Sequence, residues 1–495
     1  MIEPRVLKGF RDALPERVSA RQAMVRSIQS VYERYGFLPF DTPAIEYVDV
    51  LGKYLAETDT PEGGIFAFRD EQQEWIGLRY DLTASLSRVV AMYQQLPMPF
   101  KRYQVGPVWR KEKPGPGRFR EFFQMDFDTV GVPGMMADAE ACCVIADVLE
   151  GLGVARGDYA VRVNNRKVLN GVLEACGVAW QAEGGGLSTT GVSVLRAIDK
   201  QDRIGVEGVR RLLGEGRMDE SGDFTPGAGL TTDQIDAVLG FLDTASQTRV
   251  GFCDATDALL GDSEIGREGV RELREIDELL ANAGYDEERV VFDPSIVRGL
   301  GYYTGPVFEA DLTRPIVVDG EEKRFGSVFG GGRYDDLVER FTGKKVPATG
   351  AAIGVDRLLE AMLALGAIAG EPPSVVLITV LDRSRIADYQ AMAAEIRAAG
   401  MNAELYAGSA GIGGQLKYAD RSAKKLAVIA GEDEFSQGEV SIKDLELGRQ
   451  LAAGISERKE WLESQPAQFS VPRERLVSEV RRLLDRPPDL SEEAA

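Results

Sequence analysis

Histidine is the most informative absence in this chain of 495 residues, because it does not occur at all. The chain can therefore contain no histidine general base, no Ser–His–Asp triad and no metal held by imidazole. Any catalysis must rest on carboxylates, guanidinium groups, hydroxyls, backbone dipoles or a hard cation such as Mg²⁺. Chance depletion is a poor explanation of so complete an absence at this length.

Cysteine and long apolar runs are also scarce, and their scarcity excludes two further classes of protein. The four cysteines show neither CxxC spacing nor the framework of a disulfide-rich fold. No run approaches the roughly 18 apolar residues of a membrane span, and the N-terminus lacks the apolar core of a signal peptide. These absences predict a reduced, cytoplasmic protein with no membrane segment.

Acidic residues outnumber basic ones, and the formal net charge is −21. Because nucleic-acid binders more often carry a basic surface, RNA would have to bind where positive charge is local. Residues 101–120 hold seven Lys or Arg against one acid, and residues 417–425 hold four against one. A solvated charged face is the simpler interpretation of the second segment taken alone.

The first part of the chain has the pattern of an α+β domain built on an antiparallel sheet. Apolar residues at helical spacing predict an amphipathic helix over residues 18–35. Pro39 and Pro43 then forbid a regular interior strand. Strand-like runs follow without intervening helices, which is the order expected of antiparallel pairing. These runs span residues 64–69, 74–83, 103–111 and 122–130.

Within this domain the sequence pattern changes from strand-like to helical and later changes back. Helical patterns broken by Gly-rich stretches predict a mostly helical insertion over residues 165–285. Strands return at 290–330, and residues 348–366 read as a strand followed by a helix. We therefore assign residues 1–164 and 286–366 to one discontinuous domain.

A second domain is predicted after a short linker at residues 367–373, which is rich in Gly and Pro. Residues 374–464 alternate apolar strands and helices in the order βαβαβ, which indicates a parallel sheet and an α/β domain. Residues 465–495 are expected to form a C-terminal extension with one short helix and a disordered end.

Polar side chains alternate along the predicted strand "FFQMDFD", residues 122–128. Gln124, Asp126 and Asp128 face one side, and the apolar residues between them face the other. A row exposed to water is the ordinary interpretation of such alternation. Phe122 shares the polar side, however, which favours a row that lines a polar substrate pocket.

The segment "WIGLRYDLT", residues 75–83, repeats this alternation. As a strand it would place Arg79, Asp81 and Thr83 on one side. Carboxylate, hydroxyl and amide oxygens are the acceptors that an α-ammonium group needs. On the two strands together, these acceptors are Asp81, Thr83, Gln124 and Asp128.

Several arginines stand where anions are often bound. Arg110 and Arg118 flank a Gly- and Pro-rich loop at the ends of two predicted strands, where an arginine is held rigidly. Arg298 lies in "VRGLGYYTG", whose glycines permit close approach to a ligand, although a surface hairpin is equally compatible. Arg357 falls in the first turn of a predicted helix, where either Asp356 or a bound polyphosphate would compensate it. No GxxxxGK[ST] motif occurs, so this is not a P-loop protein.

Taken in order, these segments resemble the class II aminoacyl-tRNA synthetases, and specifically the histidyl-tRNA synthetase family. "FLPFDTPAIEYVD", "VGPVWRKEKPGPGRFREFFQMDFDTVG" and "GAAIGVDRLLEAM" resemble motifs 1, 2 and 3 of the class. "RGLGYYTG" and "GGGRYDDLV" are similar to the two signatures specific to histidine. The resemblance covers nearly the whole chain. It implies an antiparallel-sheet catalytic domain with a helical insertion, followed by an α/β anticodon-binding domain.

The resemblance implies a site for ATP with Mg²⁺ carried on the nucleotide. Arg110 would hold the α-phosphate with Glu112 nearby, and Arg118 and Arg357 would hold the β/γ end of a bent ATP. Arg298 would bridge the substrate carboxylate and the α-phosphate, where negative charge builds during attack. Arg298 and Arg110 would therefore be the catalytic residues.

The resemblance also implies a histidine site and macromolecular partners. Histidyl-adenylate would form in this site, and a homodimeric enzyme would pass the histidyl group to the terminal ribose of tRNA-His. The C-terminal domain would bind the anticodon, and the basic segment 101–120 would face the acceptor stem. The implied contacts are Asp81, Thr83 and Gln124 with the α-ammonium group, Asp128 and Tyr303 with the imidazole nitrogens, and Tyr302 and Tyr334 with the pocket wall.

Two segments depart from the family's usual pattern. Gly301 stands where the signature usually has aspartate, so the pocket either loses a carboxylate or relies on a neighbour such as Asp128. The motif 2 loop "KEKPGPG" differs from common bacterial forms. This difference leaves open how the acceptor end is read and whether an extra 5′ nucleotide is required.

Two other functions are compatible with part of this pattern. A non-catalytic, synthetase-like regulator of histidine biosynthesis would share the catalytic domain, but such proteins usually lack the anticodon domain and the catalytic arginines. An ATP-dependent ligase with a non-tRNA acceptor would not need the C-terminal domain. Because Arg110, Arg298, Arg357 and that domain are all present, the pattern favours the aminoacylating enzyme.

Overall fold

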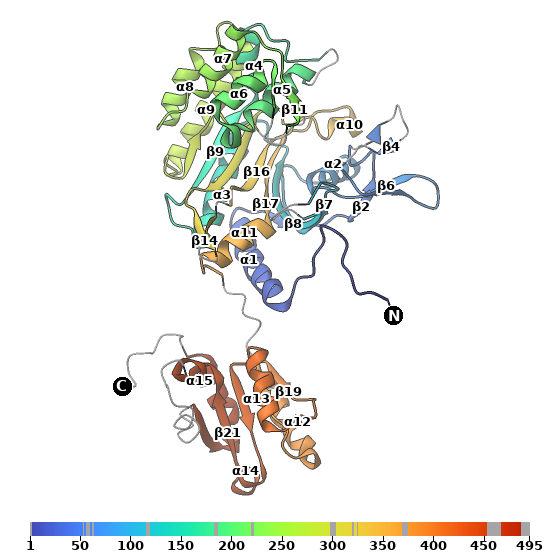
Figure 1. Ribbon diagram of the computed structural model, residues 1–495, viewed down its shortest axis with the longest axis vertical. Helices are drawn as coiled ribbons and strands as arrows, with labels where there is room; N and C mark the ends of the chain where they lie inside the picture. Colours follow the sequence, from blue (N-terminus) through green and yellow to red (C-terminus); the bar gives the residue numbers. More distant parts are fainter. Residues whose placement is uncertain are drawn as a thin grey trace. The chain divides into compact units, whose positions relative to one another are not determined.

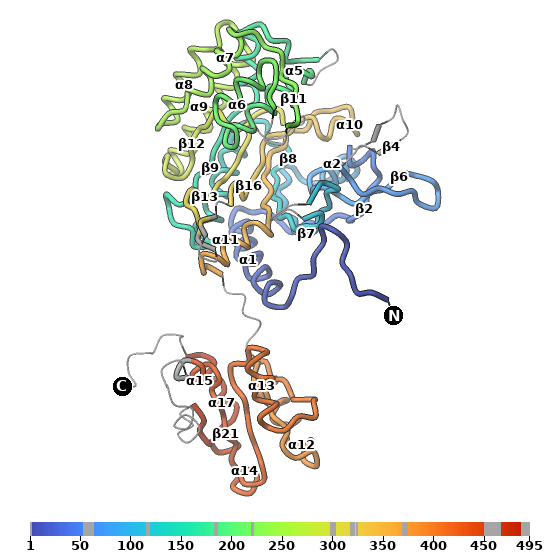
Figure 2. The backbone as a smooth tube through the Cα atoms, viewed as in Figure 1, coloured from blue at the N-terminus to red at the C-terminus, as the bar shows by residue number. Residues whose placement is uncertain are grey.

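The chain folds into two compact units, the first made up chiefly of residues 20–369 and the second chiefly of residues 370–495. A computed structural model describes residues 2–52, 54–55, 60–61, 64–114, 119–182, 187–218, 222–297, 303–318, 321–323, 325–368, 375–452 and 467–486. Figure 2 follows the backbone through both units, with the C-terminal unit in orange and red. No helix in these described ranges is long and apolar enough to cross a bilayer.

An eight-stranded sheet forms the centre of the first unit, in the order β1-β7-β8-β17-β16-β13-β9-β12 (Figure 1). The six central strands pair antiparallel, whereas β1 and β12 add parallel edges. The predicted α+β class is therefore confirmed. The strands are β1 (Leu38–Pro39), β7 (Phe100–Trp109), β8 (Glu121–Val130), β9 (Tyr159–Asn165), β12 (Val290–Phe292), β13 (Pro306–Leu312), β16 (Ser327–Arg333) and β17 (Ala348–Gly354).

Helix α1 (Pro15–Arg34) packs on the apolar face of this sheet, as the helical spacing of its apolar residues predicts. The Tyr32 ring lies 5.0 Å from the ring of Phe127 and 5.8 Å from that of Tyr103, centre to centre. Helix α3 (Met136–Gly151) belongs to the same core and is buried over most of its length. The alternate side chains of β8 must then point to the opposite face, which is the face that carries the polar row.

The predicted helical insertion consists of six helices and one hairpin in the described ranges, and Figure 1 shows the helices gathered at one end of the unit. Side chains of Ser188, Thr231, Thr248 and Ser263 cap four of the helices, which explains where those helices begin. The apolar core of the insertion is continuous with that of the sheet. The elements are α4 (Arg166–Ala175), α5 (Thr189–Ile198), α6 (Gln201–Leu213), β10 (Gly216–Met218), β11 (Phe224–Pro226), α7 (Thr232–Leu242), α8 (Arg249–Asp257) and α9 (Glu264–Asn282).

The predicted strand over 74–83 is wrong in its second half. Strand β6 spans only Trp75–Leu78 and lies in a small sheet of order β2-β6-β5, and helix α2 begins at Thr83. The chain turns here because Asp81 accepts a hydrogen bond from the backbone N of Ala84, at 3.0 Å, in the first turn of α2. The smaller elements are β2 (Ile45–Tyr47), β3 (Tyr54–Leu55), β4 (Thr60–Pro61), β5 (Ala67–Arg69), α2 (Thr83–Met92), β14 (Ile316–Val318), β15 (Glu321–Lys323), α10 (Glu339–Thr342) and α11 (Val355–Ala364).

The second unit is an α/β domain with a mixed five-stranded sheet of order β19-β18-β20-β21-β22. The βαβαβ order correctly predicts its three parallel strands, to which β21 and β22 add antiparallel pairs. Residues 468–484 of the expected extension contribute β22 and α17 to this domain. Its elements are β18 (Val376–Ile378), α12 (Ile386–Ala398), β19 (Ala403–Leu405), α13 (Ile412–Arg421), β20 (Leu426–Ile429), α14 (Glu432–Gln437), β21 (Glu439–Asp444), α15 (Leu445–Ala452), β22 (Gln468–Pro472) and α17 (Leu476–Leu484).

An ion pair between the buried Arg289 and the half-buried Glu150 ties the start of β12 to the end of α3. Arg289 Nε and Nη2 donate to the two carboxylate oxygens of Glu150, at 2.7 and 2.9 Å. Burial raises the pKa of Glu150, but hydrogen bonds from Arg289, Tyr159 and Arg156 outweigh it and lower the pKa to about 2. The stability that this carboxylate contributes is therefore present above its ordinary pKa and lost as the pH falls toward 2.

We expect Arg289→Met to reduce the free energy of unfolding at pH 7 by about 1 to 3 kcal/mol, the usual cost of losing hydrogen bonds to a charged group. The loss should shrink between pH 5 and pH 3, because Glu150 is protonated in the unfolded chain at that pH and the pairing with Arg289 then contributes less to stability. Urea denaturation at both pH values measures this difference. Arg156→Met is the matched control, because Arg156 contacts the same carboxylate but is 54 % exposed. An equal loss in both variants would contradict the prediction.

Candidate active site

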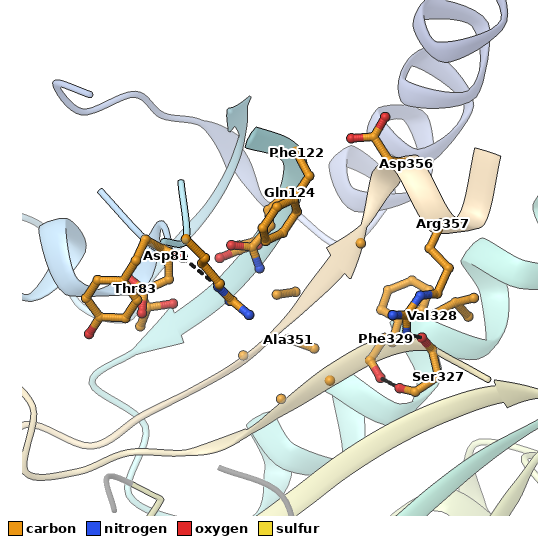
Figure 3. Close-up of a pocket in the computed structure, with 18 of the residues that line it drawn as sticks. Asp81, Thr83, Phe122, Gln124, Ser327, Val328, Phe329, Ala351, Asp356 and Arg357 are labelled. Carbon is orange, nitrogen blue, oxygen red and sulfur yellow. Dashed lines mark hydrogen bonds between the residues drawn. The ribbon is translucent and has the colours of Figure 1, made fainter. Parts of the chain in front are cut away.

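A cavity of about 650 Å³ opens on the polar face of the large sheet, opposite the face that carries α1. Figure 3 shows Asp81 and Thr83 on one side of it and Arg357 on the other. Residues from the turn before α2, from β8, from β16 and from β17 line the cavity. The structure brings together here nine of the residues predicted from the sequence: Asp81, Thr83, Arg110, Glu112, Gln124, Asp128, Tyr303, Tyr334 and Arg357.

The predicted residues Arg118, Arg298 and Tyr302 lie outside the described residues, as does Gly301. Their assignments therefore stay predictions.

Asp81 and Thr83 reach the cavity from a strand-to-helix turn and not from one face of a strand. Burial raises the pKa of Asp81, and the backbone hydrogen bond from Ala84 and the charge of Arg110 oppose that rise. Arg79, which a strand would have placed beside them, does not line the cavity. Its guanidinium is buried and donates to the carbonyl oxygens of Thr42 and Pro107, at 2.7 and 3.0 Å.

The polar row of β8 lies in the cavity wall and not in open solvent. Gln124, Asp126 and Asp128 are respectively 7 %, 2 % and 2 % exposed, and all three line the cavity. The position of Phe122 on the same side of the strand, also in the cavity lining, is the sequence signal that indicated this. A buried row of carboxyl and amide groups is costly unless a partner or a ligand satisfies it.

Arg102 is the main partner of this row, and the sequence interpretation missed it. It is fully buried on β7 directly opposite Asp128, and its Nη2 lies 2.7 Å from Asp128 Oδ2. The same Nη2 donates to the carbonyl of Leu82 at 3.1 Å, and the hydroxyl of Tyr334 donates to Asp128 Oδ1. Burial raises the pKa of Asp128, and Arg102 and Tyr334 counter that rise. The predicted strand over 103–111 begins one residue after Arg102, so the sequence interpretation had no register that included this pair.

Glycine at position 350 on β17 makes room for this carboxylate. Gly350 lies opposite Asp128 in the strand register, and a Cβ atom there would lie 2.3 Å from Asp128 Oδ1. No real Cβ atom makes so short a contact, so any larger residue would displace the carboxylate. A glycine in the strand therefore shapes the floor of the cavity.

Two arginines and one glutamate also line the cavity, with Arg110 beside the Tyr80–Asp81 turn and Arg357 across the cavity from it. Arg110 follows β7 directly, and its Nε donates to the carbonyl oxygen of Tyr80 at 3.2 Å. Arg357 is the third residue of α11, and its Nη1 donates to the carbonyl of Ser327 at 2.8 Å. Glu112 lines the cavity beside Arg110. Two guanidinium groups that project into one polar cavity are suited to hold a polyphosphate.

Asp356, which the sequence offered as a counter-charge for Arg357, pairs with a residue from far along the chain. Its Oδ1 lies 2.7 Å from Arg11 Nη2, and its Oδ2 accepts the backbone N–H of Phe123 at 2.8 Å. This carboxylate therefore fastens the N-terminal segment and β8 to the start of α11.

Arg333, next to Tyr334 in the segment "GGGRYDDL", is a second buried arginine whose role the sequence did not reveal. Its guanidinium pairs with the fully buried Asp138 of α3, and it also donates to the carbonyls of Val132 and Gly134, at 3.1 and 2.9 Å. Its own carbonyl accepts the backbone N–H of Thr304 at 2.8 Å. These contacts hold in place the strand end from which Tyr334 reaches the cavity.

Two models of known protein families match the chain. The family model described as histidyl-tRNA synthetase matches residues 9–358, and one described as an anticodon binding domain matches residues 374–465. The chain belongs to the histidyl-tRNA synthetase family. The family model spans the sheet, the insertion and every described residue of the cavity lining.

Individual relatives are similar to the chain over nearly its whole length. The histidine–tRNA ligase of Cereibacter sphaeroides is 54 % identical over 480 residues, which are 96 % of this chain and 97 % of the relative. That of Brucella abortus is 49 % identical over 489 residues, 98 % of this chain and 96 % of the relative. The crystal structure of histidyl-tRNA synthetase from Nostoc sp. PCC 7120 has a TM-score of 0.74 at 28 % identity, covering 97 % of this chain and 100 % of that one.

Proposed function

We propose that this chain activates histidine with ATP, releasing pyrophosphate, and then transfers the histidyl group from the adenylate to tRNA-His. One observation carries the proposal: acceptors suited to an amino acid and arginines suited to a polyphosphate line the same cavity. Membership of the histidyl-tRNA synthetase family and relatives named histidine–tRNA ligase support it. A purely regulatory protein would have no use for Arg110 and Arg357 in that cavity or for a matched anticodon binding domain.

We propose that the amino acid lies across the turn before α2 and the polar row of β8. Asp81, Thr83 and Gln124 would accept hydrogen bonds from the α-ammonium group, which needs three acceptors. The resemblance assigns the imidazole nitrogens to Asp128 and Tyr303, and Tyr302 and Tyr334 to the wall. The lining position of Asp128, Tyr303 and Tyr334 supports this arrangement.

We propose that ATP extends across the cavity between Arg110 and Arg357. Arg110, with Glu112 nearby, would face the α-phosphate, while Arg357 and the predicted Arg118 would face the β- and γ-phosphates. Arg298 would bridge the carboxylate of histidine and the α-phosphate. The described residues contain no group of three or more His, Cys, Asp or Glu arranged to hold a metal ion. Mg²⁺ would be bound mainly through the phosphates, whose charge it neutralises.

For tRNA, we propose that the second unit reads the anticodon and that the basic segment near motif 2 approaches the acceptor stem. In the structure, part of the positive charge of each basic segment is buried or paired with an acid. Lys101 pairs with Glu140 at 2.6 Å and Arg102 is fully buried, so the exposed positive charge of the first segment begins at Lys111. In the second segment, Lys424 is nearly buried and pairs with Glu404. Filter binding of tRNA at increasing salt concentration tests this proposal, because binding through phosphate contacts weakens as the salt concentration rises.

We also propose a homodimer in the cytoplasm. Strand β1 is an edge of the large sheet, and several apolar side chains between residues 38 and 98 are exposed, as apolar side chains in a protein interface would be in a single chain. All four cysteines carry free thiols, in keeping with a reducing compartment. Sedimentation equilibrium of the purified chain distinguishes a dimer from a monomer. The exposed residues are Leu38, Ile45, Tyr47, Phe68, Met92, Tyr93 and Met98.

ATP–pyrophosphate exchange with each of the twenty amino acids tests the proposed activation step. We expect exchange with histidine alone, because a site that bonds polar ring atoms rejects side chains that leave those bonds unmade. Arg298→Ala should abolish the exchange if this arginine bridges the two reacting groups. Histidine binding without any exchange would contradict the proposal and favour the regulatory function. Charging of tRNA-His by the wild type then tests the transfer step separately.

A further inference from the structure

The N-terminal segment, residues 2–14, approaches the wall of the cavity at one short stretch. Only Gly9, Phe10 and Arg11 are partly buried in this segment, and its other residues are exposed. The Phe10 ring lies 6.0 Å from that of Phe66, centre to centre. Because so little apolar surface of the segment is buried, its polar contacts decide where it lies.

Backbone contacts hold this stretch beside the start of β8. The carbonyl oxygen of Gly9 accepts the backbone N–H of Arg120 at 2.7 Å, and that of Lys8 accepts Nη1 of Arg120 at 3.4 Å. Gly9 has a φ of +87°, and a Cβ atom there would lie 2.9 Å from Cγ of Arg120. Glycine therefore allows the segment to come this close to β8.

Arg11 then contacts two residues of the cavity lining. Its Nη2 donates to Asp356 Oδ1 at 2.7 Å, and its guanidinium carbon lies 3.9 Å from the centre of the Phe119 ring. Its Nη1 lies 3.6 Å from Glu360 Oε1, one turn further along α11. Asp356 and Phe119 line the cavity, whereas Arg11 is not among the described lining residues. Arg11 is thus placed to act on a ligand through Asp356.

The carboxylate of Asp356 is unfavourable to the ligand proposed for this cavity, because a negative charge repels a polyphosphate. Asp356 directly precedes Arg357, and Figure 3 shows the two side chains leaving the start of α11 in different directions. The carboxylate also has a structural task, since its Oδ2 accepts the backbone N–H of Phe123 at 2.8 Å and so ties α11 to β8. The guanidinium of Arg11 sets a permanent positive charge against this carboxylate.

We propose that Arg11 is a positioning residue for ATP, which acts by offsetting the charge of Asp356 in the cavity wall. Asp356 keeps the start of α11 on β8, and Arg11 compensates the negative charge that this attachment brings near the phosphates. The proposal rests on ATP binding as part of the proposed function. It adds a residue of the N-terminal segment to the arginines that the family resemblance implies.

The KM for ATP in histidine-dependent pyrophosphate exchange tests the proposal. Arg11→Met should raise this KM about tenfold, the order expected when one charge near a polyphosphate is no longer offset, and should change the KM for histidine by less than about twofold. Arg11→Lys keeps the charge, so its KM for ATP should stay within about threefold of the wild-type value. Arg5→Met is the matched control, because it removes the same charge from an exposed position of the same segment and should leave both constants unchanged.

A double variant shows whether the effect passes through Asp356. Asp356→Asn removes the charge but keeps an oxygen that can accept the N–H of Phe123. Arg11→Met/Asp356→Asn should therefore recover a KM for ATP within about threefold of the wild-type value. Raising the salt concentration from about 0.05 M to about 0.5 M should also narrow the difference between wild type and Arg11→Met, because salt screens partly exposed charges. A merely structural role of Arg11 would produce neither result.

The outcomes separate this proposal from the proposed function. An unchanged KM for ATP in Arg11→Met would overturn the role of Arg11 while leaving histidine activation intact. A raised KM that the double variant fails to recover would overturn it as well, because the loss would then not pass through the charge of Asp356. Absence of any histidine-dependent exchange in the wild type would overturn the proposed function itself.

Discussion

Replacing Arg110 by alanine is expected to lower kcat for histidine-dependent pyrophosphate exchange by about a hundredfold to a thousandfold, the usual loss when one preorganised donor is removed from a developing charge. Attack of a carboxylate on the α-phosphate of ATP builds negative charge on the phosphoryl oxygens. A fixed guanidinium stabilises that charge without having to reorganise as the reaction proceeds.

Arg110 is held rigidly enough for this role. Its backbone N–H donates to the carbonyl of Arg120 at 2.9 Å, and its Nε donates to that of Tyr80 at 3.2 Å. Its guanidinium also lies 5.2 Å from the centre of the Phe122 ring. Arg110 and Phe122 both line the cavity, which is where the proposed substrates would bind.

The experiment compares Arg110→Ala with Arg110→Lys and with Arg267→Ala. Lysine keeps the charge but loses the planar fork, so an intermediate rate is expected. Arg267 is a partly exposed residue of the helical insertion, and its removal should change the exchange rate by less than about twofold. Near-identical thermal unfolding of the variants would show that the rates report chemistry. A loss below about tenfold in Arg110→Ala would remove this arginine from the reacting centre.

Replacing Arg333 by methionine is expected to have the largest effect on stability, a loss of about 3 to 5 kcal/mol, as for a buried ion pair broken on one side. Arg333 is 2 % exposed, and Asp138 is fully buried against it. The variant would leave Asp138 and the carbonyl groups of Val132 and Gly134 without their donor.

The effect should depend on pH in a direction that follows from Asp138. Burial raises its pKa to about 6 in spite of Arg333, so removing the arginine raises that pKa further. A carboxyl whose folded pKa is raised contributes stability at low pH, and loses it as the pH rises through that pKa. The difference between wild type and Arg333→Met should therefore be larger at pH 8 than at pH 5, as measured by urea denaturation.

The double variant Arg333→Met/Asp138→Leu is the decisive control. Removing both charges should restore part of the lost stability, because no unpaired charge remains buried. Restoration should be incomplete, since the two carbonyl groups still lack a donor. A double variant no more stable than Arg333→Met, together with a loss that does not change with pH, would show that packing and not charge accounts for the effect.

Local pattern in the sequence determined much of the fold and part of the site. Helical spacing predicted α1, and the strand alternation of "FFQMDFD" placed Gln124 and Asp128 on one side of β8. The arrangement of strands and helices in the C-terminal domain followed from its βαβαβ order. These features can be predicted from the sequence because side-chain periodicity within one element depends only on that element's own geometry.

Only the tertiary structure decided which distant residues meet. The pairing of Arg102 with Asp128 depends on the register of β7 against β8, and the pairing of Arg333 with Asp138 joins residues 195 positions apart. The sequence likewise did not predict that β6 ends at Leu78, because the alternation of apolar residues continues past the turn that Asp81 stabilises. Periodicity within a segment cannot report such contacts, because register and packing are set by the whole core and not by neighbouring residues.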